Sequence, residues 1–292
     1  MKKYDAAIAF ARDHAFNLRA LPAEERDAIR CVVECHSAVN EGYTRLPDAV
    51  FEQDGAVGLL WQLYERCTEQ VKGALVAMAT ACPASSEALS RVSLEATVTI
   101  RYILGERNSR MASYLMDHVV QAERQERQWR KASEQLKGEE KSVYLAACDY
   151  RMQGIAVMKS FVDMLTAQLV PSSSVPSWPN IGSRFEAIGD SLAYRTFYAR
   201  LCTATHFDAE DTLRYAIGKA AGPEMFERVA VETVMFSRFL LAEAVRAYAE
   251  TGKAYATSYS MEGAIETCKS AESLVRFHSL NLSRHVGGIE LS

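Results

Sequence analysis

Apolar residues recur every three to four positions along almost the whole chain, which is the spacing of amphipathic helices. Helices are predicted at 2–19, 22–45, 57–81, 85–105, 109–137, 139–169, 181–190, 191–206, 209–220, 224–250 and 260–285. Pro22 and Pro223 stand where a helix begins, and Pro83 follows the end of another. The pattern predicts an all-α fold of about 9–11 helices, packed as one or two antiparallel bundles.

The clearest interruption of this pattern is the segment PSSSVPSWPN at 171–180. We expect it to be a loop between an N-terminal region, 1–170, and a C-terminal region, 181–285, although one domain with a crossing loop fits equally well. The helix at 109–137 alternates acids and bases, which is typical of a solvated arm. A dimerisation arm and an RNA-binding face are the alternatives for this helix.

Composition narrows the functional classes. The 292 residues include 33 Lys and Arg against 37 Asp and Glu, a formal net charge of −4, so we expect no binding to duplex DNA and only local contacts with RNA. The seven cysteines are odd in number and scattered, which indicates reduced thiols in a reducing compartment. No apolar run reaches the ~18 residues of a membrane span. We therefore expect a cytoplasmic protein that does not enter a membrane.

Candidate chemistry lies in the predicted helix 191–206. At ~100° per residue, Arg195, Tyr198, Cys202 and His206 fall on one narrow stripe. The opposite side carries the apolar residues Ala193, Phe197, Leu201 and Ala204. Solvated helix faces usually carry Lys, Glu and Gln, so the stripe is either a functional cleft or a buried structural network.

Glu95 is a natural partner for this stripe. It lies among apolar residues on the predicted helix 85–105, where burying an unpaired carboxylate is costly. Either it pairs locally with Arg91, four residues earlier, or it reaches Arg195 or His206 on the other helix. The second arrangement would build an acid–base site in the core of a bundle.

Two sequence motifs resemble those of an uncharacterised helical bacterial family. Its members carry an Arg…Glu-Ala…Tyr helix and, after a Trp-Pro loop, a Tyr-x-x-Leu-(Ser/Cys)-x-x-x-His signature. The matching residues are Arg91, Glu95, Ala96 and Tyr102 for the first motif, and Trp178, Pro179, Tyr198, Leu201, Cys202 and His206 for the second. The resemblance covers about residues 85–215 and implies no particular activity.

A looser similarity is to the HEPN superfamily, whose ribonuclease members carry an Arg, four to six residues, and then a His near a helix end. Arg200 and His206, with five residues between them, fit that spacing. The resemblance implies metal-independent RNA cleavage, often at a dimer cleft, with Arg stabilising phosphate charge and His moving protons. On an unbroken helix, however, Arg195 lies closer to the His206 face than Arg200 does.

No motif implies a cofactor or a metal. Cys31, Cys35 and His36 could form a metal half-site, but no second cluster accompanies them. Two hypotheses follow. The first is an RNA-cleaving or RNA-processing protein of toxin or phage-defence type, an RNA-binding homo-oligomer with His206, Arg195, Arg200, Tyr198 and Glu95 at its site. The second is a non-catalytic interaction or scaffold protein in which these side chains form a buried network.

Overall fold

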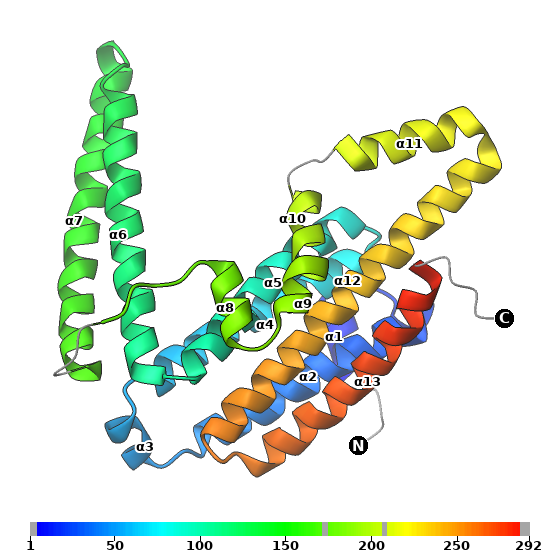
Figure 1. Cartoon of the computed structure of the whole chain (residues 1–292), viewed down its shortest axis with the longest axis horizontal. Helices are drawn as coiled ribbons and strands as arrows, with labels where there is room; N and C mark the ends of the chain where they lie inside the picture. Colours follow the sequence, from blue (N-terminus) through cyan, green and yellow to red (C-terminus); the bar gives the residue numbers. More distant parts are fainter. Residues whose placement is uncertain (1–4, 171–174, 206–208, 287–292) are drawn as a thin grey trace. The chain divides into compact units, whose positions relative to one another are not determined.

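The computed structural model describes residues 5–170, 175–205 and 209–286, and every regular element in these ranges is helical (Figure 1). The all-α prediction is therefore confirmed. The elements are α1 Asp5–Asp13, a 3₁₀ turn Leu18–Ala20, α2 Ala23–Thr44, α3 Asp48–Gln53, α4 Val57–Ala79, α5 Pro83–Leu104, α6 Arg107–Ser133, α7 Gly138–Leu169, α8 Ile181–Ala187, α9 Ser191–Ala193, a π-helical turn Tyr194–Tyr198, α10 Ala199–Thr205, α11 Ala209–Ala221, α12 Pro223–Ser258 and α13 Glu262–Val286.

Helix boundaries follow from local chemistry. Pro83 and Pro223 are the first residues of α5 and α12, where a proline loses no intrahelical hydrogen bond. Gly138, at the turn between α6 and α7, has a φ of +60°, which glycine adopts without steric strain. The sequence pattern missed the short helix α3, because six residues are too few to show a helical period.

The chain divides into two compact units, which are described separately. The first comprises 1–47, 60–104 and 181–292, and the second comprises 48–59 and 105–180. This grouping differs from the predicted division at 171–180. The reason is that α12 packs against α13, α5 and α2, so helices from both ends of the chain share one core.

The centre of the first unit is an aromatic stack. The rings of Tyr64 and Tyr248 are stacked 5.0 Å apart, and Tyr255 lies 6.2 Å from Tyr64. All three side chains are fully buried. The Tyr248 hydroxyl lies 2.9 Å from Thr68 Oγ1, which gives a polar atom in this core a partner.

The second unit is built on the antiparallel pair α6 and α7 (Figure 1). Their acids and bases pair within the unit: Lys159 lies 3.3 Å from Glu123, and Arg130 pairs with Asp149. Part of the charge predicted for a solvated arm at 109–137 therefore serves to join two helices.

All seven cysteines are free, and only Cys82 is exposed while Cys202 is half-buried. None of the helices in the described ranges is long and apolar enough to cross a bilayer.

Close packing at Gly252 gives a test of the core. A Cβ atom there would lie 2.7 Å from Tyr64 Oη and 3.0 Å from Cys268 Sγ. Since overpacking outweighs the gain in helix propensity, Gly252→Ala should lower the free energy of unfolding by about 1–2 kcal/mol. Urea denaturation followed by circular dichroism measures this.

Gly263→Ala is the matched control, because a Cβ there meets nothing within 4 Å. Its stability should equal or exceed that of the wild type. Equal stabilities for both variants would contradict the packing described around Gly252.

Candidate functional site

A polar cluster joins α5 to the π-helical turn of the first unit. The Tyr198 hydroxyl donates a hydrogen bond to Glu95 Oε1 at 2.7 Å. Arg91 Nε lies 3.2 Å from the same carboxylate oxygen, one helical turn before Glu95. We call these three side chains the Arg91–Glu95–Tyr198 cluster. Of the two partners predicted for Glu95, the local one, Arg91, is therefore present.

Apolar packing around Tyr198 holds the cluster in place. The Tyr198 ring is 6% exposed and belongs to a core cluster with Leu94, Val98 and Leu201. Burial of this ring points its hydroxyl toward α5, where Glu95 precedes Val98 by three residues. The Arg91 guanidinium carbon lies 5.8 Å from the Tyr198 ring centroid, within the range of a cation–π contact.

The cluster is only partly shielded from solvent. The side chains of Arg91 and Glu95 are 25% and 39% exposed. A small ligand or a single-stranded polymer could therefore reach the charged atoms without opening the core. The exposure also means that water screens the ion pair, so its contribution to stability is modest.

Burial raises the pKa of Tyr198, and its hydrogen bond to the Glu95 carboxylate raises it further. Tyr198 therefore stays protonated at neutral pH and acts as a hydrogen-bond donor. For Arg91, desolvation lowers the pKa, but the hydrogen bond to Tyr198 and the charge of Glu95 raise it by more. Arg91 is thus a permanent cation, and Cys202 packs against the same core cluster as Tyr198.

The segment that carries Tyr198 is not a regular α-helix. Residues 191–205 form α9, the π-helical turn Tyr194–Tyr198 and α10. A π turn closes i→i+5 hydrogen bonds and so holds an extra residue; such turns are frequent at functional sites. Because the wider turn rotates the residues on its two sides relative to each other, the stripe calculated for an unbroken helix does not hold.

Two arginines of the predicted site lie elsewhere. Arg195 is exposed, whereas Tyr198 is buried. Arg200 is half-buried against α12, with its guanidinium carbon 5.3 Å from the Phe236 ring centroid. Tyr198, by contrast, faces α5. His206 lies outside the described residues, and so does its predicted meeting with Glu95.

Sequence reasoning underrated Arg91, which it treated as a local partner of Glu95 and left out of the candidate site. The sequence feature that could have identified Arg91 as a site residue is that it belongs to the same motif as Glu95. The structure brings Arg91 and Glu95 of the first motif together with Tyr198 and Cys202 of the second.

A second polar network fixes the start of the π-helical segment. Arg101 Nη1 lies 3.3 Å from Asp190, which precedes α9, and 3.1 Å from Glu250 of α12. Arg246 also pairs with Glu250. Burial raises the pKa of the Glu250 carboxyl, and these two arginines partly offset the rise. This network connects α5, the residue before α9, and α12.

No group of three or more His, Cys, Asp or Glu side chains within the described part of the chain could hold a metal ion. Cys31 and Cys35, the predicted half-site, are buried in α2. His36 lies 2.7 Å from Glu65.

Sequence comparison matches residues 58–223, more than half of the chain, to a family of unknown function, DUF5677. The protein belongs to this family, and the matched segment includes both motifs. No curated protein and no solved structure matches the chain. Membership of an uncharacterised family is thus confirmed, while the similarity to the HEPN superfamily stays a prediction.

The hydrogen bond between Tyr198 and Glu95 gives a stability prediction. Tyr198→Phe should lower the free energy of unfolding by about 1 kcal/mol, because the half-exposed carboxylate loses a neutral donor. Tyr194→Phe, an exposed tyrosine on the same turn, is the matched control and should change little. Denaturant titrations of the three proteins at neutral pH measure the difference.

The same pair has a defined pH dependence. Because folding raises the pKa of Tyr198, its stabilising effect is complete below the ordinary tyrosine pKa of about 10 and declines as the pH rises through the higher folded value. The stability gap between wild type and Tyr198→Phe should therefore be constant from pH 7 to 9 and shrink above pH 10. A gap that widens at high pH would contradict the donor role of Tyr198.

Proposed function

We propose that the Arg91–Glu95–Tyr198 cluster, together with His206, forms a metal-independent RNA-cleaving or RNA-processing site. The observation that carries the proposal is the 2.7 Å hydrogen bond by which Tyr198 of one motif meets Glu95 of the other, beside the cation Arg91. Two motifs about 100 residues apart in sequence thereby contribute to one partly exposed polar surface.

The chemistry needs no metal. A neutral His206 takes the proton of a ribose 2′-hydroxyl, whose oxygen attacks the adjacent phosphorus. The bond between phosphorus and the 5′-oxygen breaks, and that oxygen takes up a proton returned by the His206 imidazolium through water, which leaves a 2′,3′-cyclic phosphate and a 5′-hydroxyl end. Histidine suits this task because its pKa lies near neutrality, and proton transfer of this kind contributes about 10²–10⁴-fold.

Arg91 replaces Arg195 and Arg200 as the group proposed to stabilise phosphate charge. Its planar guanidinium matches the geometry of a phosphate, and its raised pKa keeps it charged at every working pH. Glu95 and Tyr198 act as positioning residues: the carboxylate orients Arg91, and the phenol orients the carboxylate. Arg195 offers a second, solvent-exposed cation on the same turn.

The charge balance restricts the substrate. A formal net charge of −4 argues against tight binding of long duplexes, since such binding rests on many phosphate contacts. The proposed substrate is therefore a short, single-stranded RNA segment held at few phosphates.

The alternative is a non-catalytic scaffold whose polar cluster is structural. The observation that favours it is that the Glu95 carboxylate already accepts the Tyr198 hydroxyl and pairs with Arg91. In that case the cluster fastens the π-helical turn to α5 and needs no ligand.

Cleavage of a fluorescently labelled single-stranded RNA in the presence of EDTA tests the proposal. Wild type should cut it and leave a cyclic phosphate end, and His206→Ala and Arg91→Ala should each slow cleavage about 100-fold or more. Controls are His14→Ala and Arg66→Ala, which replace exposed side chains of the same types. Circular dichroism confirms that each variant is folded.

Intact RNA with folded wild type, or equal rates for His206→Ala and wild type, would contradict the nuclease. Loss of cleavage on adding EDTA would contradict its metal independence. If RNA stays intact while Tyr198→Phe is destabilised, the scaffold alternative is supported.

A further inference from the structure

Helix α7 carries two apolar seams. The first packs against α6 and consists of the buried residues Cys148, Ile155, Val162 and Leu169, spaced seven residues apart. This spacing is that of one position in a heptad, as in coiled coils and antiparallel helix pairs. Helix α6 therefore covers one side of α7.

Among the described residues of the second unit, none covers the second seam. It follows the heptad spacing of four and three residues, and we call it the outer face of α7. Its members are Val143, Ala147, Tyr150, Gly154, Val157, Phe161 and Met164. Tyr150 and Val157 are 78% and 72% exposed, and none of the seven carries a charge. A helix with apolar residues on two sides usually packs on both.

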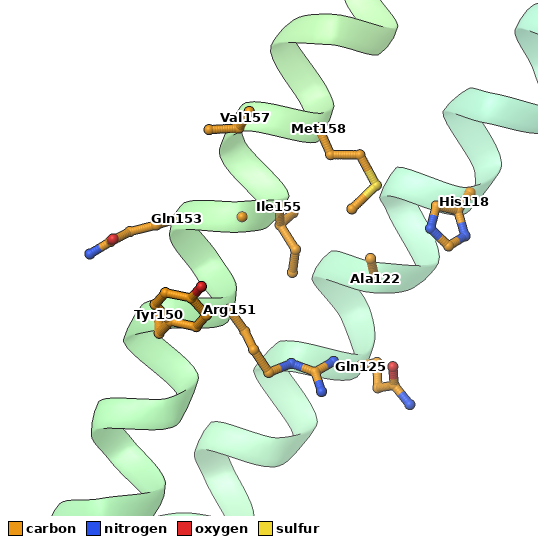
Figure 2. Close-up of a pocket in the computed structure, with 10 residues that line it drawn as sticks. His118, Ala122, Gln125, Tyr150, Arg151, Gln153, Ile155, Val157 and Met158 are labelled. Carbon is orange, nitrogen blue, oxygen red and sulfur yellow. The ribbon is translucent and has the colours of Figure 1, made fainter.

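A groove runs alongside this face. It has a volume of about 540 Å³ and lies between α6 and α7. Figure 2 shows Ile155 and Met158 pointing from α7 toward α6, with Gln153 and Val157 on the opposite side of α7. The small residues Ala122 and Gly154 line the groove, and a Cβ at Gly154 would meet nothing within 4 Å. An inserted side chain would find room there.

A charged pair fixes the register of α6 against α7. Glu126 of α6 is 1% exposed and pairs with Arg151 of α7 at 2.9 Å. The Arg151 guanidinium carbon in turn lies 4.0 Å from the centroid of the Trp129 ring. Because Glu126 is buried, a shift in the register would leave its charge without a partner. Helix α6 is thus held to one side of α7.

The order of side-chain sizes along the outer face indicates its occupant. The 3-4-3-4-3 spacing from Ala147 to Met164 reads the same in both directions about a point between Gly154 and Val157. An antiparallel copy placed on a two-fold axis at that point sets Gly154 opposite Val157, and Ala147 opposite Met164. Small residues then receive large ones, which is the complementarity of an isologous interface.

The available area is sufficient for a stable dimer. At 1.5 Å per residue the outer face is about 32 Å long, and together with the groove and the α6 residues that line it the surface is about 20 Å wide, so each copy offers about 600 Å². The total of about 1,200 Å² exceeds the ~1,000 Å² expected of a specific interface.

We propose that the outer face of α7 and its groove bind the same surface of a second copy of this chain, which gives a two-fold dimer with α7 antiparallel to α7. Two hairpins then form a four-helix arrangement that covers Tyr150, Val157 and Phe161. The partner's outer face enters the groove beside Gly154. This dimer is independent of the proposed RNA chemistry, since its residues lie in the second unit.

Sedimentation velocity of the full-length chain at about 1–50 μM tests the proposal. Wild type should sediment as a dimer. Val157→Glu should raise the dissociation constant of the dimer at least tenfold, because the new carboxylates would be buried in an apolar contact. Val120→Glu is the matched control: Val120 is 55% exposed on α6, outside the groove lining, and this variant should stay dimeric.

The pairing of Tyr150 with Phe161 tests the antiparallel register. Tyr150→Glu and Phe161→Lys should each weaken the dimer, whereas the double variant should recover it, because each new carboxylate then faces a new ammonium of the second copy. All four positions changed are exposed, so the monomer should keep its helicity in circular dichroism. A monomeric wild type, or a Val157→Glu protein as dimeric as Val120→Glu, would overturn the proposal. Failure of the double variant to recover would overturn the antiparallel register.

Discussion

The hydrogen bond from Tyr198 to Glu95 is the contact on which the candidate site depends. It joins a buried ring, which is fixed by apolar packing, to a carboxylate at the edge of the core that also pairs with Arg91. Apolar contacts between the two segments set their distance but not the direction of polar groups, whereas this hydrogen bond fixes the direction of the Glu95 carboxylate. The carboxylate therefore orients a cation on one helix by means of a hydroxyl on another.

The π-helical turn is what positions the Tyr198 hydroxyl for this contact. A π turn is less favourable than a regular helical turn and persists only where the surrounding structure requires it. Here Arg101 holds Asp190 just before the segment, and Leu201 is packed in the core just after it. The turn between these two fixed points directs the Tyr198 hydroxyl toward Glu95. The same geometry suits a catalytic surface and a structural clamp, which is why activity rather than shape distinguishes the two proposals.

Local features of the fold could be predicted from the sequence, and tertiary ones could not. Helices such as α5 and α12 follow from apolar periodicity, and the start of α12 also from the proline at its first residue. The π turn depends on packing and leaves no mark in a 3.6-residue period, so a stripe calculated for a regular α-helix could not take it into account. The grouping of 1–47 with 181–292 rests on contacts between the chain's two ends. The pairing of Glu95 with Arg91 was foreseen as one of two outcomes, because an i,i+4 partner is always within reach.

The central claim, that Glu95 and Tyr198 interact directly across the two motifs, is tested most directly by a double-mutant cycle on the free energy of unfolding. Glu95→Gln, Tyr198→Phe and the double variant should show a coupling of about 1 kcal/mol, as expected for a half-exposed hydrogen bond to a charged acceptor. Additive effects of the two substitutions, with a coupling near zero, would contradict the account.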